Sequence, residues 1–137
     1  MSINTVPASR VTPEKIERLG EREIFVFGSS LMGVHFGDAA RVAYDKFGAG
    51  GVSEGLKGST YAIPVVRAGI DMVKPHIEAF LSFARSHTEY RFFVTRIGCG
   101  IAGFTDEDIA PLFAVAVGME HVTLPASFWE VLQRKGL

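Results

Sequence analysis

Two glycine-rich stretches, residues 28–37 and 98–103, contain most of the residues that could bind or act on a ligand. Each follows a short apolar run and precedes a segment of helical character. Because glycine has no side chain, backbone N–H groups there can approach a ligand, and consecutive N–H groups can form a concave anion site. One such loop alone is better explained as a tight turn, but two in equivalent positions predict a site for a small ligand that carries phosphate.

The first loop lacks the spacing of the common nucleotide-binding motifs. It contains no G-x-G-x-x-G pattern, and no Gly-Lys-Ser/Thr triplet opens the following helix. The predicted site therefore matches neither motif, and it is predicted from the residues of the two glycine-rich stretches themselves. In the first loop these are Gly28, Ser29, Ser30, Leu31, Gly33, His35 and Gly37, and in the second they are Arg96, Gly98, Cys99, Gly100, Ile101, Ala102, Gly103 and Phe104.

Three residues of these loops have side chains that could take part in catalysis. His35 could act as a base, although a loop histidine is more often a surface residue. Asp38 could activate a water molecule, or it could be the cap of the following helix. Cys99 could be a nucleophile if a helix N-terminus lowered its pKa. The alternative, which the sequence favours, is that Cys99 is a small residue that fits a tight loop.

Other charged residues allow simpler explanations. Arg96 borders the second loop and could pair with phosphate, as could Arg67. Thr105 is predicted to cap a helix whose first turn contains acids that match the helix dipole, namely Asp106, Glu107 and Asp108. The remaining histidines, His76, His87 and His121, lack the spacing of metal ligands, so no metal site is predicted.

The composition argues against several classes of protein. Lys and Arg number 14 against 15 Asp and Glu, and they are scattered, so a basic nucleic-acid-binding patch is not expected. A single cysteine cannot form an internal disulfide, which is typical of the reducing cytoplasm. No apolar run approaches the roughly 20 residues that span a membrane, and the start of the chain does not resemble a signal peptide. We therefore expect a cytoplasmic protein with a small-molecule partner, and neither a cofactor nor an oligomeric state is indicated.

Strand-like and helix-like segments alternate along a single domain, residues 1–137. Residues 1–11 are interpreted as a loose or docking arm, and Thr12-Pro13-Glu14 is a typical helix start. The expected helices cover residues 12–19, 38–44, 71–87, 106–117 and 126–135, and the last of these contains Phe128 and Trp129, which are expected to hold it against the sheet. The expected strands cover residues 24–27, 61–65, 90–95 and 121–124, and residues 47–58 are predicted to form a loop.

This alternation predicts an α/β fold with a mixed, mostly parallel sheet covered by helices. In such folds ligands bind outside the carboxyl ends of the strands. Both glycine loops follow a strand at that position. We therefore expect them to be neighbours in space although about 70 residues separate them in sequence.

Several segments resemble a family of small bacterial and phage proteins: IFVFGSSLMG (residues 24–33), GDAA (37–40), GLKGSTYAIP (55–64), IGCGIAGF (97–104) and IAPLF (109–113). That family is in turn similar to the macro domains, which bind ADP-ribose and related nucleotides. The resemblance implies a three-layer α/β/α sandwich in which residues 29–37 face the distal ribose and residues 98–104 wrap the diphosphate. It also implies that Phe104 lies near a ribose or base.

The resemblance favours binding over hydrolysis. Ser30 stands where the family usually has an asparagine, and the aspartate that reads adenine in macro domains has no counterpart before Ile24. The first hypothesis is therefore binding of ADP-ribose or a related nucleotide. The alternatives are a hydrolase of ADP-ribosyl or phosphoester bonds that uses Asp38 or His35, and an interaction protein of phage or mobile-element origin that has no small ligand.

Overall fold

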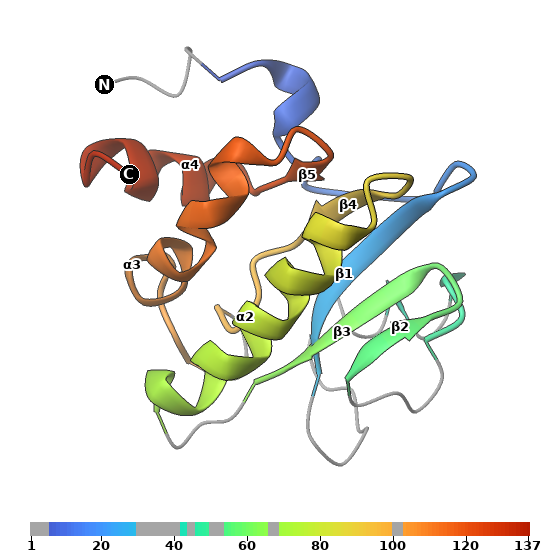
Figure 1. Ribbon diagram of the computed structural model, residues 1–137, viewed down its shortest axis with the longest axis horizontal. Helices are drawn as coiled ribbons and strands as arrows, with labels where there is room; N and C mark the ends of the chain where they lie inside the picture. The colour runs from blue at the N-terminus through green and yellow to red at the C-terminus, as the bar shows by residue number, and fades with distance from the viewer. Residues whose placement is uncertain (1–5, 30–41, 44–45, 50–53, 66–68, 100–102) are drawn as a thin grey trace.

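A five-stranded sheet lies at the centre of the computed structural model, which describes residues 6–29, 42–43, 46–49, 54–65, 69–99 and 103–137 (Figure 1). Its strands are β1 (Glu23–Ser29), β2 (Gly55–Lys57), β3 (Thr60–Pro64), β4 (Arg91–Val94) and β5 (Val122–Thr123). The α-helices of the described residues are α2 (Ile70–Ser86), α3 (Asp106–Ile109) and α4 (Ala126–Arg134). The same described residues also contain two 3-10 helices, η2 (Ala8–Arg10) and η3 (Ala110–Gly118).

The strands lie in the order β2-β3-β1-β4-β5. β1 pairs in parallel with both β3 and β4, and β4 pairs in parallel with β5. β2 pairs antiparallel with β3 at one edge. The predicted α/β class and the mixed, mostly parallel sheet are therefore confirmed.

β1 is buried on both of its faces, as its continuous apolar run predicts. Ile24 and Val26 belong to the larger apolar cluster, together with residues of α2, η3 and α4. Phe25 and Phe27 alternate with them and belong to a smaller cluster on the other face. Because successive side chains of a strand point to opposite faces, this single strand contributes to both cores.

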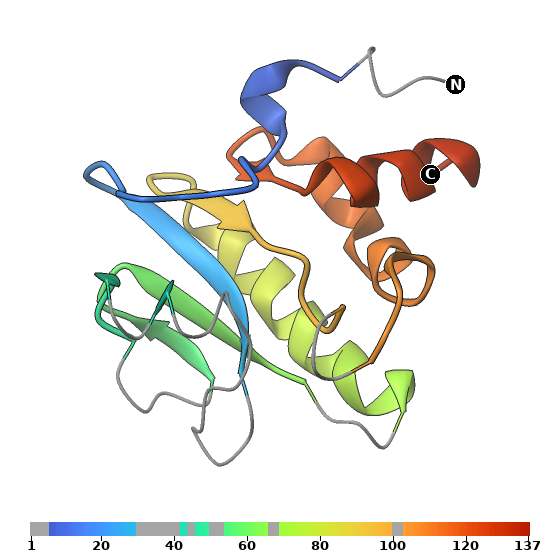
Figure 2. The ribbon, with the colours of Figure 1, turned by 180° about the vertical axis from the view of Figure 1, so that it is seen from behind.

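α2 lies along the face of the sheet that carries the larger cluster, and the views from both sides show α3 and α4 beside it (Figure 2). The apolar residues of α2 recur at the spacing of one helical face, which explains why this segment is a helix that packs on the sheet. The residues of α2 that the structure buries lie on that face: Val73, Ile77, Phe80, Leu81 and Ala84.

Described residues from two segments cover the other face of the sheet. Ala43, Phe47 and Ala49 are buried there, and Ile16 and Leu19 pack against them. Val42, Ala43 and Lys46 are helical, but most of the helix predicted over residues 38–44 lies outside the described residues. The three-layer sandwich therefore stays a prediction.

The predicted helix over residues 12–19 is wrong. These residues are all described and contain no helix. Instead of capping a helix, Thr12 is buried, and its Oγ1 lies 2.7 Å from Oγ1 of Thr123. Its backbone N–H donates to the carbonyl oxygen of Leu124 at 2.9 Å. The residue that resembles an N-cap is thus used to pair with the edge of the sheet.

Two other predictions of local structure need correction. Residues 47–58 were expected to form a loop, but Gly55–Lys57 forms the edge strand β2. The helix expected over residues 106–117 changes from α to 3-10 at Ala110. Pro111 follows directly, and because proline has no N–H it cannot donate the next α-helical hydrogen bond.

The segment Val6–Thr12, here called the N-terminal strap, docks against β5, η3 and α4 (Figures 1 and 2). Val11 forms a parallel bridge with Leu124. Arg10 extends its guanidinium over the Trp129 ring, 5.3 Å from its centroid, and accepts a 3.0 Å hydrogen bond from Trp129 Nε1 on its carbonyl oxygen. The same guanidinium donates to the carbonyl oxygens of Ala116, Val117, Met119 and Val122 at 2.9 to 3.3 Å.

Candidate functional site

The carboxyl ends of β1, β3 and β4 lie next to one another. The N–H of Val65, just after β3, donates to the carbonyl oxygen of Ser29 at 2.8 Å. On the other side of β1, the backbone N–H and the hydroxyl of Thr95 both donate to the carbonyl oxygen of Val26. These bonds place the segments that follow β3 and β4 on either side of the end of β1, where the first glycine loop begins.

The chain leaves β1 and β4 in opposite directions across the sheet. After β1 it continues towards β2 and β3, whereas after β4 it continues towards β5 on the other side. Such a reversal between adjacent parallel strands is where open α/β sheets bind ligands. The two glycine loops therefore begin at the position that the topology favours for a site.

Gly28 and Gly98 show how closely the two loop starts approach each other. A Cβ placed on Gly28 would lie 2.9 Å from Cγ2 of Val65, 3.3 Å from Cγ2 of Ile97 and 3.6 Å from the Gly98 nitrogen. Gly98 has φ +78°, and a Cβ there would lie 3.2 Å from Cδ2 of Phe104. The prediction that the loops are neighbours is confirmed for the parts of them that the structure describes.

The second loop closes on itself through its backbone. The N–H of Phe104 donates to the carbonyl oxygen of Gly98 at 2.9 Å. The ring of Phe104 is half-buried and packs against the larger apolar cluster. Phe104 was predicted to lie near a ribose or base, and the exposed part of its ring is what remains for such a contact.

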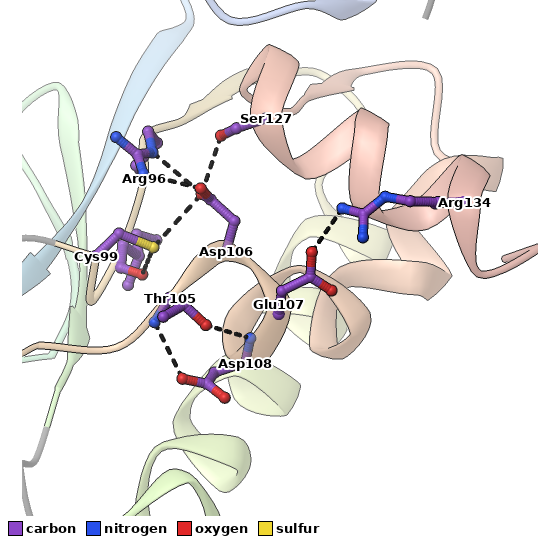
Figure 3. A network of polar contacts seen from close by, with 9 residues as sticks. Arg96, Cys99, Thr105, Asp106, Glu107, Asp108, Ser127 and Arg134 are labelled. Atoms are coloured by element: carbon purple, nitrogen blue, oxygen red, sulfur yellow. Dashed lines mark hydrogen bonds and ion pairs between the residues drawn. The ribbon is translucent and has the colours of Figure 1, made fainter. Parts of the chain in front are cut away.

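Arg96 is held by Asp106 through an edge-on pair of hydrogen bonds (Figure 3). Its Nε donates to Oδ1 at 3.1 Å and its Nη2 donates to Oδ2 at 2.8 Å. This hydrogen bond raises the pKa of Arg96 and outweighs the opposing effect of partial burial. Arg96 was predicted to pair with phosphate, and the structure gives part of its guanidinium a carboxylate partner within the chain.

Asp106 connects the second loop to two helices. Besides Arg96, it accepts a 2.9 Å hydrogen bond from Oγ of Ser127, the second residue of α4. Burial alone would raise the pKa of Asp106, but the hydrogen bonds from Arg96 and Ser127 outweigh burial and lower it. The sequence predicts for Asp106 only a match to the helix dipole, and nothing in the spacing of Asp106 and Ser127 indicates that they meet.

Cys99 is a thiol in this environment rather than an activated nucleophile. Its Sγ lies 3.6 Å from both the carbonyl oxygen of Ile97 and Oδ1 of Asp106. Burial, followed by the negative charge of Asp106, raises its pKa to about 12, although Arg96 acts in the opposite direction. Because the thiolate is the reactive form, this environment favours the interpretation of Cys99 as a small loop residue.

The start of α3 has the cap that the sequence predicts. Oγ1 of Thr105 accepts from the N–H of Asp108, and Oδ2 of Asp108 accepts from the N–H of Thr105. These two hydrogen bonds form a capping box. The N–H groups of Thr105 and Asp108 are therefore satisfied within the chain, so a bound anion would have to use other donors.

Several predicted site residues lie outside the described residues, including both candidates for hydrolysis, His35 and Asp38. Their catalytic roles stay predictions. The same applies to Arg67 and to the other predicted ligand contacts in this group, which are Ser30, Leu31, Gly33, Gly37, Gly100, Ile101 and Ala102. Of the predicted contacts that are described, Ser29 is buried at the end of β1 and Gly103 is exposed at the end of the second loop.

The three other histidines of the described residues each have a hydrogen-bond partner. Nδ1 of His76 lies 2.8 Å from Oε2 of Glu54. The rings of His87 and His121 lie 2.7 Å from the backbone carbonyl oxygens of Phe83 and Ala84 respectively. Within the described ranges, no three His, Cys, Asp or Glu side chains lie together as a metal site would require.

An open hollow of about 580 Å³ lies at the opposite edge of the sheet, near the end of α2 and the start of β5. It is lined by Arg85, Thr88, Val115, Gly118, Met119, Glu120 and His121. None of the predicted site residues lines it, and its wide opening gives a ligand little enclosure. We therefore place the candidate site at the carboxyl ends of β1 and β4, where the two glycine loops begin.

Comparison of the chain with models of protein families, with curated proteins and with solved structures found no match. The resemblance to macro domains accordingly stays a prediction from sequence. Among the helices of the described residues, none is long and apolar enough to cross a membrane.

Proposed function

We propose that the chain binds ADP-ribose or a related nucleotide diphosphate across the carboxyl edge of the sheet, between β1 and β4. The observation that carries this proposal is the reversal of chain direction at that point, with a glycine-rich loop starting on each side of it. Crevices of this kind admit a ligand because the two loops diverge. Gly28 and Gly98 support the proposal, since the close approach of the two loop starts would let one ligand touch both.

Arg96 adds a charged donor to this edge. Its side chain is 57% exposed and lies two residues before Gly98. Arginine recognises phosphate through two parallel N–H donors, and the guanidinium has edges besides the one that faces Asp106. Two of the three acids in the first turn of α3 are paired with an arginine, Asp106 with Arg96 and Glu107 with Arg134, which weakens their repulsion of an anion.

Calorimetric titration of the full chain with ADP-ribose, ADP, NAD and adenosine tests this function. We expect heat and a rise in melting temperature with the phosphate-bearing ligands, and weaker or no binding of adenosine. Binding stabilises the folded state by mass action, so both measurements report the same event. An absence of heat and of thermal shift with all four ligands would remove the proposal.

Arg96→Ala and Arg134→Ala form a matched pair for locating the site. Both arginines bind an acid in the first turn of α3 and have similar exposures, 57% and 62%. Arg134, however, is the last residue of α4 rather than a neighbour of the glycine loop. We expect Arg96→Ala to weaken ADP-ribose binding about tenfold and Arg134→Ala to leave it unchanged. Equal losses in both variants would place the ligand elsewhere.

A further inference from the structure

The guanidinium of Arg96 has one occupied edge and one open edge. Asp106 occupies the edge formed by Nε and Nη2. Nη1 lies on the other side and is directed away from Asp106 (Figure 3). None of the described residues accepts a hydrogen bond from it. Since a guanidinium has five N–H donors in a rigid plane, the edge formed by Nη1 and Nη2 can still hold two oxygens of a phosphate.

Asp106, which sets the direction of this open edge, is itself fixed in place. Its side chain is only 22% exposed, and its Oδ1 accepts hydrogen bonds from Ser127 and Cys99 as well as from Arg96. Asp106 is the first residue of α3, and Ser127 belongs to α4. The orientation of an otherwise flexible arginine is thus determined by two helices through one carboxylate.

We propose that Asp106 is the positioning residue that directs the open edge of Arg96 towards a phosphate of the ligand. This inference rests on the proposed function, because it concerns how the same site recognises phosphate. Ordering Arg96 before the ligand arrives removes part of the entropy that binding would otherwise cost. Asp106 also cancels the net charge of the arginine, so recognition depends on directed hydrogen bonds more than on bulk attraction.

The two roles of Asp106 make opposite predictions when its carboxylate is removed. If orientation dominates, Asp106→Asn and Asp106→Ala weaken binding of ADP-ribose, about fivefold to tenfold. If charge cancellation dominates, the same variants leave Arg96 unpaired and positively charged, and binding becomes stronger. A stronger or unchanged affinity overturns the inference.

A double-mutant cycle separates positioning from a general effect on the fold. Because Asp106 is proposed to act through Arg96, the variant Arg96→Ala with Asp106→Ala should bind ADP-ribose no more weakly than Arg96→Ala alone. The loss should also be confined to phosphate-bearing ligands, with any weak binding of adenosine unchanged. Additive losses, or an equal loss for adenosine, would show that Asp106 has only a structural role and would overturn the inference.

Glu107→Ala is the matched control, because Glu107 lies on the same turn and its described partners are Arg134, at 2.5 Å, and Lys135, at 4.0 Å, both at the end of α4. It should bind ADP-ribose as the wild type does.

Ser127→Ala provides a milder variant should Asp106→Ala fail to fold, and it should weaken binding about twofold to threefold. If the wild-type chain binds none of the ligands, the proposed function fails and this inference fails with it. If the wild type binds and the Asp106 and Ser127 variants bind equally well, the inference alone fails.

Discussion

Arg10 and Arg96 are both anchored by hydrogen bonds, but to opposite kinds of partner. Arg10 is surrounded by backbone carbonyl oxygens and lies over Trp129. None of the described carboxylates forms an ion pair with it. Burial lowers its pKa, although the charge of Glu120 acts in the other direction. Arg96 is half-exposed, and its hydrogen bond to the Asp106 carboxylate raises its pKa.

The difference separates an arginine that holds the fold together from one that is available to a ligand. Arg10 satisfies several carbonyl oxygens at once, and each would lose a partner if the side chain were removed. Arg96 has a charged partner near solvent, and such pairs contribute little to stability. We therefore expect changes at Arg10 to alter stability and changes around Arg96 to alter reactivity and binding.

The largest expected effect concerns the thiol beside Arg96. With a pKa of about 12, Cys99 should react with iodoacetamide at about pH 8 roughly a thousand times more slowly than a free thiol. Asp106→Asn should accelerate the reaction because it removes a negative charge that disfavours the thiolate. Mass spectrometry of the alkylated chain measures both rates. A rate in the native protein close to that in the urea-unfolded chain would contradict the assigned environment.

Removing the side chain of Arg10 should give the largest loss of stability. We expect Arg10→Ala to lower the free energy of unfolding by about 2–3 kcal/mol, because the hydrogen bonds that the charged guanidinium donates to four carbonyl oxygens are lost. Urea denaturation followed by circular dichroism measures the loss. Arg18→Ala, which removes an exposed arginine, should change stability by less than about 0.5 kcal/mol. Equal effects of the two variants would remove the distinction drawn between the half-buried Arg10 and an exposed arginine.

Two glycines, Gly28 at the candidate site and Gly118 near Arg10, allow the same comparison to be made for the backbone. Gly28→Ala would place a Cβ 2.9 Å from Val65 and should cost about 1–2 kcal/mol, since the packed strand ends must shift. Gly118 lies among the carbonyl groups that bind Arg10, and a Cβ there would meet nothing within 4 Å. Gly118→Ala should therefore be neutral or slightly stabilising in the same denaturation experiment. A neutral Gly28→Ala would show that Gly28 and Val65, at the ends of β1 and β3, are less tightly packed than described.

The smallest expected effect is the contribution of Asp106 to stability, which we expect to stay below about 1 kcal/mol. Because its folded-state pKa lies below the ordinary value of 3.8, the contribution is present above that pH and is lost as the pH falls through the folded-state value. The stability difference between the wild type and Asp106→Asn should therefore shrink between about pH 6 and about pH 2. A difference that is independent of pH would mean that the ion pair contributes nothing.

The sequence predicts those parts of the fold whose signals are local and repeated. The apolar periodicity of α2 and the apolar run of β1 are satisfied by packing of the kind that they predict, and the apolar residues 92–94 lie in the predicted strand β4. Thr12 shows the limit of such reasoning. Its local context favours a helix cap, but a hydrogen bond to Thr123, 111 residues away, takes its hydroxyl. Local propensity was overridden by a long-range partner that no pattern around Thr12 reveals.

The candidate site likewise has one part that the sequence predicts and one part that it does not. The two glycine loops were recognisable because glycine is unusual in such numbers, and topology then places Gly28 beside Gly98. The partner of Arg96 was not recognisable, because an acid in the first turn of a helix has an adequate local explanation. Only the folded chain brings Ser127 to Asp106 as well. Pairings of single charged residues across elements therefore need the structure, whereas clusters of one residue type do not.

The contacts of Arg10 also have a consequence for how the chain is made. Its carbonyl partners lie 106 to 112 residues further along. At about 5–20 residues per second, ribosomes would synthesise them roughly 5–20 s after Arg10. During that interval the N-terminal strap has no surface to dock on, and closing such a long loop costs entropy before any contact is gained. The strap is thus expected to pair with the β5 edge of the sheet late in biosynthesis. Ribosome-bound nascent chains that stop before η3 should leave the strap open to proteases.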